Sequence, residues 1–384
     1  MEHLINKRVK EIQISGIRKF SNLVAQYQDA ISLTIGQPDF PTPEHIKQAA
    51  KTAIDQNKTA YTQNPGLPEL RRAASRFLQA KYQLSYNPET EVITTIGASQ
   101  AIDIALRTIL EEGCEVLLPG PVYPGYEPLI KLSGAVPVYV DTTTNGFKIN
   151  AALLKPRITH KTRCIILPYP SNPTGCVLDE QDLAEIADLL RDKEIFVISD
   201  EIYSELIYDK PHRSIASLPF MREKTIVING LSKSHSMTGW RIGFAFAPAA
   251  ITQHMVKVHQ YNVTCASTIS QYAALEALSQ GLDDAGPMKR EYKKRRDYVY
   301  DRLTAMGFDV VKPDGAFYVF PSIKAFHMKS FDFAAKLLEE QRVAVVPGEA
   351  FSPLGEGYIR ISYAYSMDVL REGLDRIEQF VRSL

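Results

Sequence analysis

The stretch Asn229–Gly243 has the sequence N-G-L-S-K-S-H-S-M-T-G-W-R-I-G and places Lys233 eight residues before Arg241. An apolar run, residues 225–228, leads directly into this stretch, so we expect the lysine at the mouth of a buried strand. Burial makes it easier for a lysine to lose its proton, and the neutral amine is the form that makes a Schiff base. A solvated loop lysine beside a glycine turn is the alternative interpretation of this stretch taken alone.

The composition excludes several classes of protein. Lys+Arg and Asp+Glu both number 44 in the 384 residues, so the net charge is zero and indicates no basic surface for nucleic acid or membrane. Four cysteines are widely spaced without a C-x-x-C pair, which is typical of reduced thiols rather than of a disulfide frame or a metal site. The charged N-terminus lacks the apolar core of a signal peptide, and no apolar run reaches membrane-spanning length. We therefore expect a soluble, cytoplasmic protein without metal, nucleic-acid or membrane partners.

Short apolar runs alternate with longer amphipathic runs through the middle of the chain. Seven runs have strand character: residues 92–96, 115–118, 136–140, 163–167, 195–199, 225–229 and 242–246. Helices are expected between them, for example at 99–112 and 180–192, and Pro68 is expected to start a helix that ends near Tyr82. This alternation predicts an α/β protein whose seven-stranded, mostly parallel sheet is covered by helices on both faces.

The regular alternation of predicted strands and helices stops near both ends of the chain. Residues 1–45 contain short helical pieces (about 2–12 and 16–28) and a proline-rich segment that stops regular structure. Beyond about residue 285, a long charged helix precedes short strands at 317–320, 343–346 and 358–363 and a closing helix from Met367. We therefore expect an N-terminal arm that also completes the small domain (1–45), a large domain (46–284) and a small α+β domain (285–384).

Polar residues follow five of the predicted strands at the point where each strand ends. They are the glycine–serine turn at Gly97–Gln100, the ring of Tyr123, the amide of Asn172, the carboxylate of Asp200 and the amine of Lys233. Ligands in open α/β sheets bind beyond the carboxyl ends of the strands, so we expect these groups to line one site. Each group has an ordinary alternative, such as a helix cap for the glycine–serine turn or for Asp200, but their joint occurrence favours a cofactor site.

Pyridoxal phosphate is the cofactor that needs this set of groups. Its aldehyde needs a lysine, its phosphate needs a helix start with glycine and serine, and its ring needs a stacking aromatic residue. Its pyridine nitrogen needs a buried carboxylate, because protonation of that nitrogen makes the ring an electron sink for the substrate carbanion. The sequence therefore predicts a pyridoxal-phosphate site.

The opening stretch is similar to the lysine signature of class I/II pyridoxal-phosphate aminotransferases of fold type I. Further motifs stand in the family's order along the chain: I-G-Q-P-D-F, Y-T-Q-N-P-G-L-P-E-L-R, S-N-P-T-G, S-D-E-I-Y and the late R-I-S-Y. The resemblance covers essentially the whole chain. It implies transfer of an amino group between an amino acid and a 2-oxo acid, with 2-oxoglutarate as the common acceptor.

The resemblance implies a role for each matching residue at the cofactor. Lys233 resembles the lysine that binds the cofactor covalently and then transfers the proton between Cα and C4′. Asp200 resembles the acid paired with the ring nitrogen. Tyr203 and Asn172 resemble the pair that hydrogen-bonds the phenolic oxygen and so lowers the pKa of the cofactor–lysine linkage. Tyr123 resembles the aromatic residue stacked on the ring.

The resemblance also implies the ligands of the phosphate. Ala98, Ser99 and Arg241 resemble phosphate ligands, and the fork of an arginine suits a phosphate. Gly230 departs from the family here, because some relatives carry a phosphate-binding serine three residues before the lysine. Tyr61 resembles the tyrosine that reaches the phosphate of the neighbouring subunit, which implies a homodimer with shared active sites.

Two residues resemble groups that bind the substrate. Arg360 resembles the arginine that forks onto the α-carboxylate, and Gly36 resembles a backbone contact to the same carboxylate. An exposed arginine on an edge strand is the alternative for Arg360, and an ordinary proline-rich turn is the alternative for Gly36. The resemblance assigns Asn172 to substrate binding as well as to the cofactor.

The identity of the substrate is the least determined part of the resemblance. Ser99 stands where relatives that act on acidic substrates can carry a lysine, which leaves room for a larger or neutral substrate. The chain resembles bacterial aminotransferases of amino-acid biosynthesis, and N-acetyl-LL-2,6-diaminopimelate of lysine biosynthesis is the leading expectation. Broad aspartate or aromatic specificity is the near alternative.

Two other classes of function share this scaffold. C–S β-lyases and cyclopropane synthases use the same lysine on other bonds, and assays of pyruvate and thiol release against pyridoxamine formation separate them from aminotransferases. A non-catalytic, ligand-sensing module of a transcription regulator would need an added DNA-binding domain. Residues 1–45 are too few and insufficiently basic for such a domain.

Overall fold

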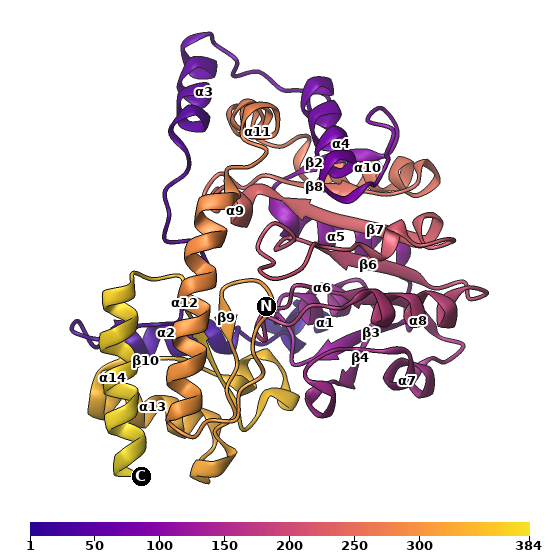
Figure 1. Ribbon diagram of the computed structural model, residues 1–384. Coiled ribbons are helices and arrows are strands. Elements are labelled where there is room, and N and C mark those ends of the chain that lie inside the picture. Colours follow the sequence, from indigo (N-terminus) through magenta and orange to yellow (C-terminus); the bar gives the residue numbers. More distant parts are fainter.

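A seven-stranded sheet forms the centre of the larger part of the protein in the computed structural model, which describes residues 1–384 (Figure 1). Its strand order is β2-β8-β7-β6-β5-β3-β4. The strands are β2 (Val92–Thr95), β3 (Glu115–Gly120), β4 (Val136–Asp141), β5 (Thr162–Leu167), β6 (Phe196–Asp200), β7 (Thr225–Gly230) and β8 (Gly243–Phe246). β8 runs antiparallel to both of its neighbours, β2 and β7, and the other pairs are parallel. The predicted α/β fold with a mostly parallel sheet is confirmed.

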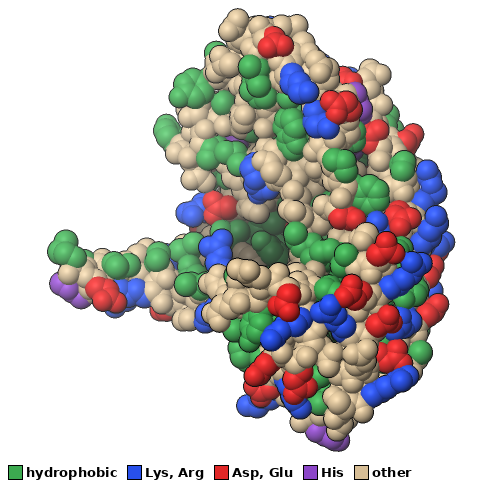
Figure 2. Space-filling model, turned by 90° about the vertical axis from the view of Figure 1, so that its left-hand side faces the viewer, with side chains coloured by type: hydrophobic (Ala, Val, Ile, Leu, Met, Phe, Trp, Pro, Cys, Tyr) green, Lys and Arg blue, Asp and Glu red, His purple; other side chains and the backbone are tan.

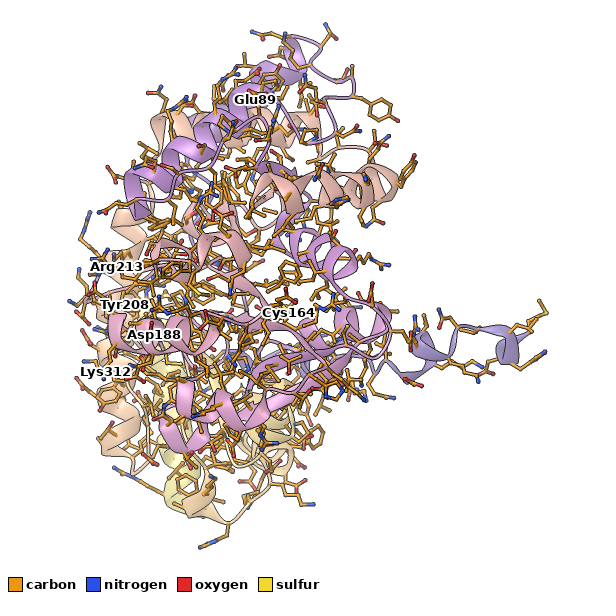
Figure 3. The ribbon with its side chains drawn as sticks, turned by 90° about the vertical axis from the view of Figure 1, so that its right-hand side faces the viewer. Glu89, Cys164, Asp188, Tyr208, Arg213 and Lys312 are labelled. Carbon is orange, nitrogen blue, oxygen red and sulfur yellow. The ribbon has the colours of Figure 1, made fainter.

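Both faces of this sheet are buried, because alternate residues of a strand pack into different core clusters. In β5, Cys164 and Ile166 pack with helices α5, α6 and α10, whereas Ile165 and Leu167 pack with α8 on the opposite face. Figure 3 shows Cys164 inside the molecule, and its thiol is free. A strand that is covered on both faces has a nearly continuous apolar sequence, which is why the central runs could be recognised.

The helices begin and end close to the predicted positions. α4 (Pro68–Tyr82) starts at the expected proline, and α5 (Gly97–Ile109) and α8 (Glu180–Leu190) match two of the expected helices. The other helices of the larger part are α3 (Glu44–Asp55), α6 (Tyr126–Leu132), α7 (Ala151–Leu154), α9 (Leu231–Ser234), α10 (Ala249–Val263) and α11 (Thr268–Gln280). No helix combines the length and the apolar character that crossing a membrane requires.

The N-terminal segment packs on the C-terminal elements. β1 (Ile31–Ser32) pairs in parallel with β10 (Val343–Ala344). β11 (Val346–Pro347), β12 (Ile359–Ser362) and β9 (Tyr318–Val319) form an antiparallel sheet in the order β11-β12-β9. Phe20 and Leu33 share a core cluster with α12 (Ala285–Ala305), α13 (Ser330–Gln341) and α14 (Met367–Ser383). The expected strand at 343–346 is two strands, because the chain leaves one sheet after Ala344 and enters another at Val346.

The first residues form an arm that projects from the body of the protein, and the surface is hollowed where this arm joins (Figure 2). A 3₁₀ helix (Glu2–Leu4) and α1 (Lys7–Glu11) replace the single helix expected at 2–12. The helix restarts because the Asn6 side chain caps α1 by accepting a hydrogen bond from the Arg8 backbone N–H at 2.9 Å. α2 (Gly16–Val24) follows and is shorter than the predicted helix at 16–28.

Candidate active site

A cavity of about 460 Å³ lies beyond the carboxyl ends of β2, β3, β5, β6 and β7. The structure brings every predicted site residue to this cavity except Tyr61. The predicted residues that line it are Gly36, Ala98, Ser99, Tyr123, Asn172, Asp200, Tyr203, Lys233, Arg241 and Arg360. Tyr61 lies outside the cavity, and 85% of its surface is exposed.

Lys233 faces the cavity from α9, the short helix that directly follows β7. Its Nζ donates a hydrogen bond to the Gly36 carbonyl oxygen at 2.5 Å. The pKa of Lys233 is lowered to about 8, chiefly by burial and then by the positive charges of Arg360 and Arg241, while the charge of Asp200 opposes the shift. The solvated loop lysine is therefore not what the structure contains. At pH 7 about a tenth of an amine with this pKa is neutral and able to attack a carbonyl group, a far larger fraction than for a lysine of ordinary pKa.

Asp200 ends β6 inside the protein, with only 6% of its surface exposed. Its carboxylate accepts hydrogen bonds from the Tyr126 hydroxyl at 2.6 Å and from the Ile202 backbone N–H at 3.2 Å. Burial raises the pKa of Asp200, while the two hydrogen bonds and the charge of Lys233 counteract that rise. A buried acid with one hydroxyl partner is suited to hold a protonated ring nitrogen. Sequence reasoning missed Tyr126, although it follows Tyr123 by three residues in P-V-Y-P-G-Y.

The start of α5 forms a cradle for an anion. No side chain caps this helix, so the backbone N–H groups of its first turn stay free, and the Ser99 hydroxyl lies beside them in the cavity lining. Gly97 has a φ of +72°, and a Cβ there would lie 2.6 Å from Nη2 of Arg241, so only glycine lets the guanidinium come this close. Arg241 itself has a φ of +51° and faces the cavity. Free N–H groups and a guanidinium together suit a phosphate better than a simple helix cap.

Arg360 is a buried cation without a carboxylate partner. It lies on β12, the middle strand of its sheet, and only 2% of its surface is exposed, so the edge-strand alternative does not hold. Nη1 donates to the Asn172 Oδ1 at 2.9 Å and Nη2 donates to the Thr34 carbonyl oxygen at 2.6 Å, while the buried Nε has no partner. Burial lowers the pKa of Arg360. A buried guanidinium with an unused donor indicates a site for an anionic group such as a carboxylate.

Two tyrosines complete the wall between Arg360 and Lys233. The Tyr203 hydroxyl lies 2.9 Å from the Tyr318 hydroxyl, and the Lys233 Nζ lies 5.6 Å from the centre of the Tyr203 ring. Tyr123 also lines the cavity and makes an edge-to-face contact with Tyr126, with 5.6 Å between ring centres. Sequence reasoning missed Tyr318, because nothing local in G-A-F-Y-V-F distinguishes it from a core residue.

This set of donors fits pyridoxal phosphate. Lys233 offers an amine of lowered pKa, the Gly97 turn and Arg241 offer an anion cradle, and Asp200 offers a buried carboxyl group. The unpaired Nε–H of Arg360 adds a donor for a second anion, the carboxylate of a substrate. Comparison with known proteins supports the same cofactor: residues 28–377 match the profile of the family "Aminotransferase class I and II".

The chain belongs to the class I and II aminotransferase family. Members of this family use pyridoxal phosphate to move amino groups between amino acids and 2-oxo acids, so this chain is a pyridoxal-phosphate-dependent aminotransferase. It is 64% identical to the "probable N-acetyl-LL-diaminopimelate aminotransferase" of Bacillus subtilis, over 99% of this chain and 96% of that protein.

Two solved structures of relatives share the fold over nearly the whole chain. The aspartate aminotransferase of Thermus thermophilus superposes with a TM-score of 0.93 at 36% identity and covers 99% of both chains. The aromatic aminotransferase of Pyrococcus horikoshii superposes with a TM-score of 0.90 at 45% identity and covers 95% of this chain and 99% of that one. Relatives with different substrates thus share one scaffold, so the scaffold alone does not fix the substrate.

The lowered pKa of Lys233 predicts how cofactor attachment depends on pH. Only the neutral amine attacks the aldehyde, so the rate should rise about tenfold per unit below a pH of about 8 and level off above it. With a lysine of ordinary pKa, the rate of cofactor attachment would keep rising up to about pH 10. Stopped-flow absorbance after mixing cofactor-free protein with pyridoxal phosphate measures this rate. A rate that still rises tenfold between about pH 9 and pH 10 would contradict the lowered pKa.

Proposed function

We propose that this protein is a cytoplasmic, homodimeric aminotransferase that exchanges the amino group of N-acetyl-LL-2,6-diaminopimelate with 2-oxoglutarate in lysine biosynthesis. The observation that carries the proposal is the 64% identity, over essentially the full length, to the Bacillus subtilis protein with that printed function. The absence of a lysine at Ser99 also favours a substrate larger than aspartate.

The chain's own residues have separate tasks in this reaction. When bound, pyridoxal phosphate takes up the amino group and draws electrons from Cα, which makes the Cα proton acidic. Arg360 holds the α-carboxylate, and with Asn172 it orients Cα so that its proton faces Lys233. The Lys233 amine removes that proton and returns it to the cofactor side. Asp200 keeps the ring nitrogen protonated, because a buried carboxylate beside that nitrogen favours its positive charge.

A second hollow gives room for a long substrate. It measures about 830 Å³, lies between the N-terminal segment and α6, and shares Ile17 and Tyr123 with the cavity described above. Its lining includes several charged residues, of which Lys131 is already paired with Glu127 at 2.5 Å. Arg18 also lines the hollow, and its side chain is exposed. N-acetyl-LL-2,6-diaminopimelate carries a second carboxylate beyond its reacting end, and we assign Arg18 to that carboxylate.

The proposal of a dimer rests on two exposed features. Tyr61 lies far outside the cavity of its own chain, with 85% of its surface exposed, and is free to reach the phosphate site of a second copy. The N-terminal arm exposes Leu4, Ile5, Val9 and Ile14, which a second copy would cover. Gel filtration with light scattering tests the dimer directly.

Half-reactions with single amino acids test the substrate. Mixing the holoenzyme with one donor at a time and following pyridoxamine phosphate formation gives kcat/KM for each donor. We expect N-acetyl-LL-2,6-diaminopimelate to exceed aspartate and phenylalanine by at least about tenfold, since a charge-assisted contact is worth about 1.4 kcal/mol or more. A higher value for aspartate or an aromatic donor would contradict the substrate, and release of pyruvate and thiol from a cysteine conjugate would indicate a β-lyase.

Arg18→Ala tests whether Arg18 in the second hollow binds the second carboxylate of the substrate. It should lower kcat/KM for N-acetyl-LL-2,6-diaminopimelate by about tenfold and leave short donors such as alanine unchanged. Lys19→Ala is the control, because Lys19 is the exposed neighbour and does not line the hollow. An equal loss for short and long donors would show that Arg18 supports the fold of α2 rather than the substrate.

A further inference from the structure

Tyr318 occupies a junction between the carboxylate site and the cofactor site. It lies on β9, its side chain is fully buried, and it lines the cavity. Its hydroxyl lies 2.9 Å from the Tyr203 hydroxyl, and neither hydroxyl has another partner in the protein. The Arg360 guanidinium lies over its ring, with 4.4 Å between the guanidinium carbon and the ring centre. Tyr318 is thus held at its hydroxyl by Tyr203 and on one ring face by Arg360.

The two hydroxyls contain only two protons, which limits how they are arranged. If Tyr203 donates to Tyr318, the Tyr203 hydroxyl has no proton left for a group in the cavity and can only accept a hydrogen bond there. If Tyr318 donates to Tyr203, the Tyr203 proton is free to point into the cavity, where Lys233 and the cofactor meet. Only the second arrangement leaves a Tyr203 proton for a group that binds in the cavity.

We propose that Tyr318 is a positioning residue that directs the Tyr203 hydroxyl proton at the phenolic oxygen of the cofactor. The inference rests on the role assigned to Tyr203 above and extends it to a residue on the other side of the cavity. The positive charge of Arg360 over the ring polarises the Tyr318 hydroxyl and makes it a better donor. Successive hydrogen bonds polarise one another, so the Tyr203 hydroxyl in turn becomes a stronger donor.

Gly36 belongs to the same arrangement. A Cβ at this position would lie 3.1 Å from the Tyr318 hydroxyl, so a larger residue would force that hydroxyl to shift from its place beside Tyr203. The Gly36 carbonyl oxygen meanwhile accepts the hydrogen bond of Lys233 at 2.5 Å. The backbone of Gly36 therefore accepts the hydrogen bond of Lys233, and its lack of a side chain leaves room for the Tyr318 hydroxyl beside Tyr203.

The test is a pH titration of the absorbance of the Lys233-bound cofactor in the holoenzyme. Tyr318→Phe keeps the ring under Arg360 and removes only the hydroxyl. We expect the midpoint to rise by about one pH unit, because the deprotonated linkage loses part of its hydrogen-bond stabilisation. Tyr203→Phe should raise the midpoint further, and the double variant should equal Tyr203→Phe alone, because Tyr318 acts through Tyr203.

The outcomes separate the inference from the role of Tyr203. A raised midpoint in Tyr203→Phe with an unchanged one in Tyr318→Phe would show that Tyr318 only packs under Arg360. Additive shifts in the double variant would show that Tyr318 acts on the cofactor without Tyr203 and would overturn the proposal. An unchanged midpoint in Tyr203→Phe would instead refute the role of Tyr203 itself.

A matched control separates the hydroxyl from general effects of mutation. Tyr363 is another fully buried tyrosine, and its hydroxyl donates to the Ala316 carbonyl oxygen at 3.3 Å, outside the cavity lining. Tyr363→Phe should leave the midpoint unchanged, and thermal unfolding of each variant reports any loss of fold. If Tyr363→Phe shifts the midpoint as much as Tyr318→Phe does, the shift is not specific to the Tyr203 contact and the proposal fails.

Discussion

Lys233→Ala is expected to lower kcat for transamination by about 10⁴-fold or more. The variant loses both the amine that binds the cofactor covalently and the base that moves the Cα proton, and a general base alone contributes up to about 10⁴-fold. No other lysine lines the cavity, so no neighbour replaces it. Single-turnover conversion of bound cofactor to pyridoxamine phosphate measures the loss without interference from product release.

The same variant should still bind the cofactor. Asp200, the Gly97 turn and Arg241 are untouched, so pyridoxal phosphate should bind without a covalent bond and leave on dialysis. Lys289→Ala is the matched control, because Lys289 is also partly buried and burial also lowers its pKa, yet it lies outside the cavity. Near-normal turnover in Lys233→Ala would place the reactive amine elsewhere.

Arg360→Ala is expected to lower kcat/KM by about 10²- to 10³-fold for every amino-acid donor. Removing one partner of a buried, hydrogen-bonded charge pair costs about 3–4 kcal/mol, and the α-carboxylate is common to all donors. The loss should appear mainly in KM, while the absorbance of the bound cofactor persists, because Arg360 does not hold the phosphate. Steady-state kinetics with a long and a short donor measure both parameters.

Arg360→Lys distinguishes charge from geometry. A lysine keeps the positive charge but cannot fork onto a carboxylate while also reaching Asn172 and Thr34, so it should recover only a small part of the loss. Unchanged kinetics in either variant would show that the carboxylate binds elsewhere. A loss restricted to one donor would assign Arg360 to the substrate side chain instead.

The sequence predicted the central sheet well, because its strands are covered on both faces. Such strands are continuous apolar runs, and those of β5, β6 and β7 could be recognised without their neighbours. Pro68 gave the start of α4 because a proline favours the first position of a helix. The N-terminal helices were less predictable, since a single side chain, Asn6, divides one amphipathic segment.

The residues at strand ends were predictable for the same reason, whereas contacts between distant segments were not. Asp200 and Lys233 each follow an apolar run, so their place at the cavity follows from strand direction alone. Whether Arg360 lies at an edge or in the middle of a sheet depends on which strands pair with β12, and no local pattern gives that order. Tyr126 and Tyr318 were missed because their partners lie 74 and 115 residues away in the sequence.

The most direct test of the central claim, that Lys233 carries the cofactor, is borohydride reduction of the holoenzyme followed by tryptic peptide mass analysis. Reduction makes the covalent bond permanent, and a modified lysine is not cleaved by trypsin. The structure predicts one modified peptide, Thr225–Arg241, in which cleavage after Lys233 is missing. A cofactor mass on any other lysine peptide, or no covalent cofactor at all, would contradict the account.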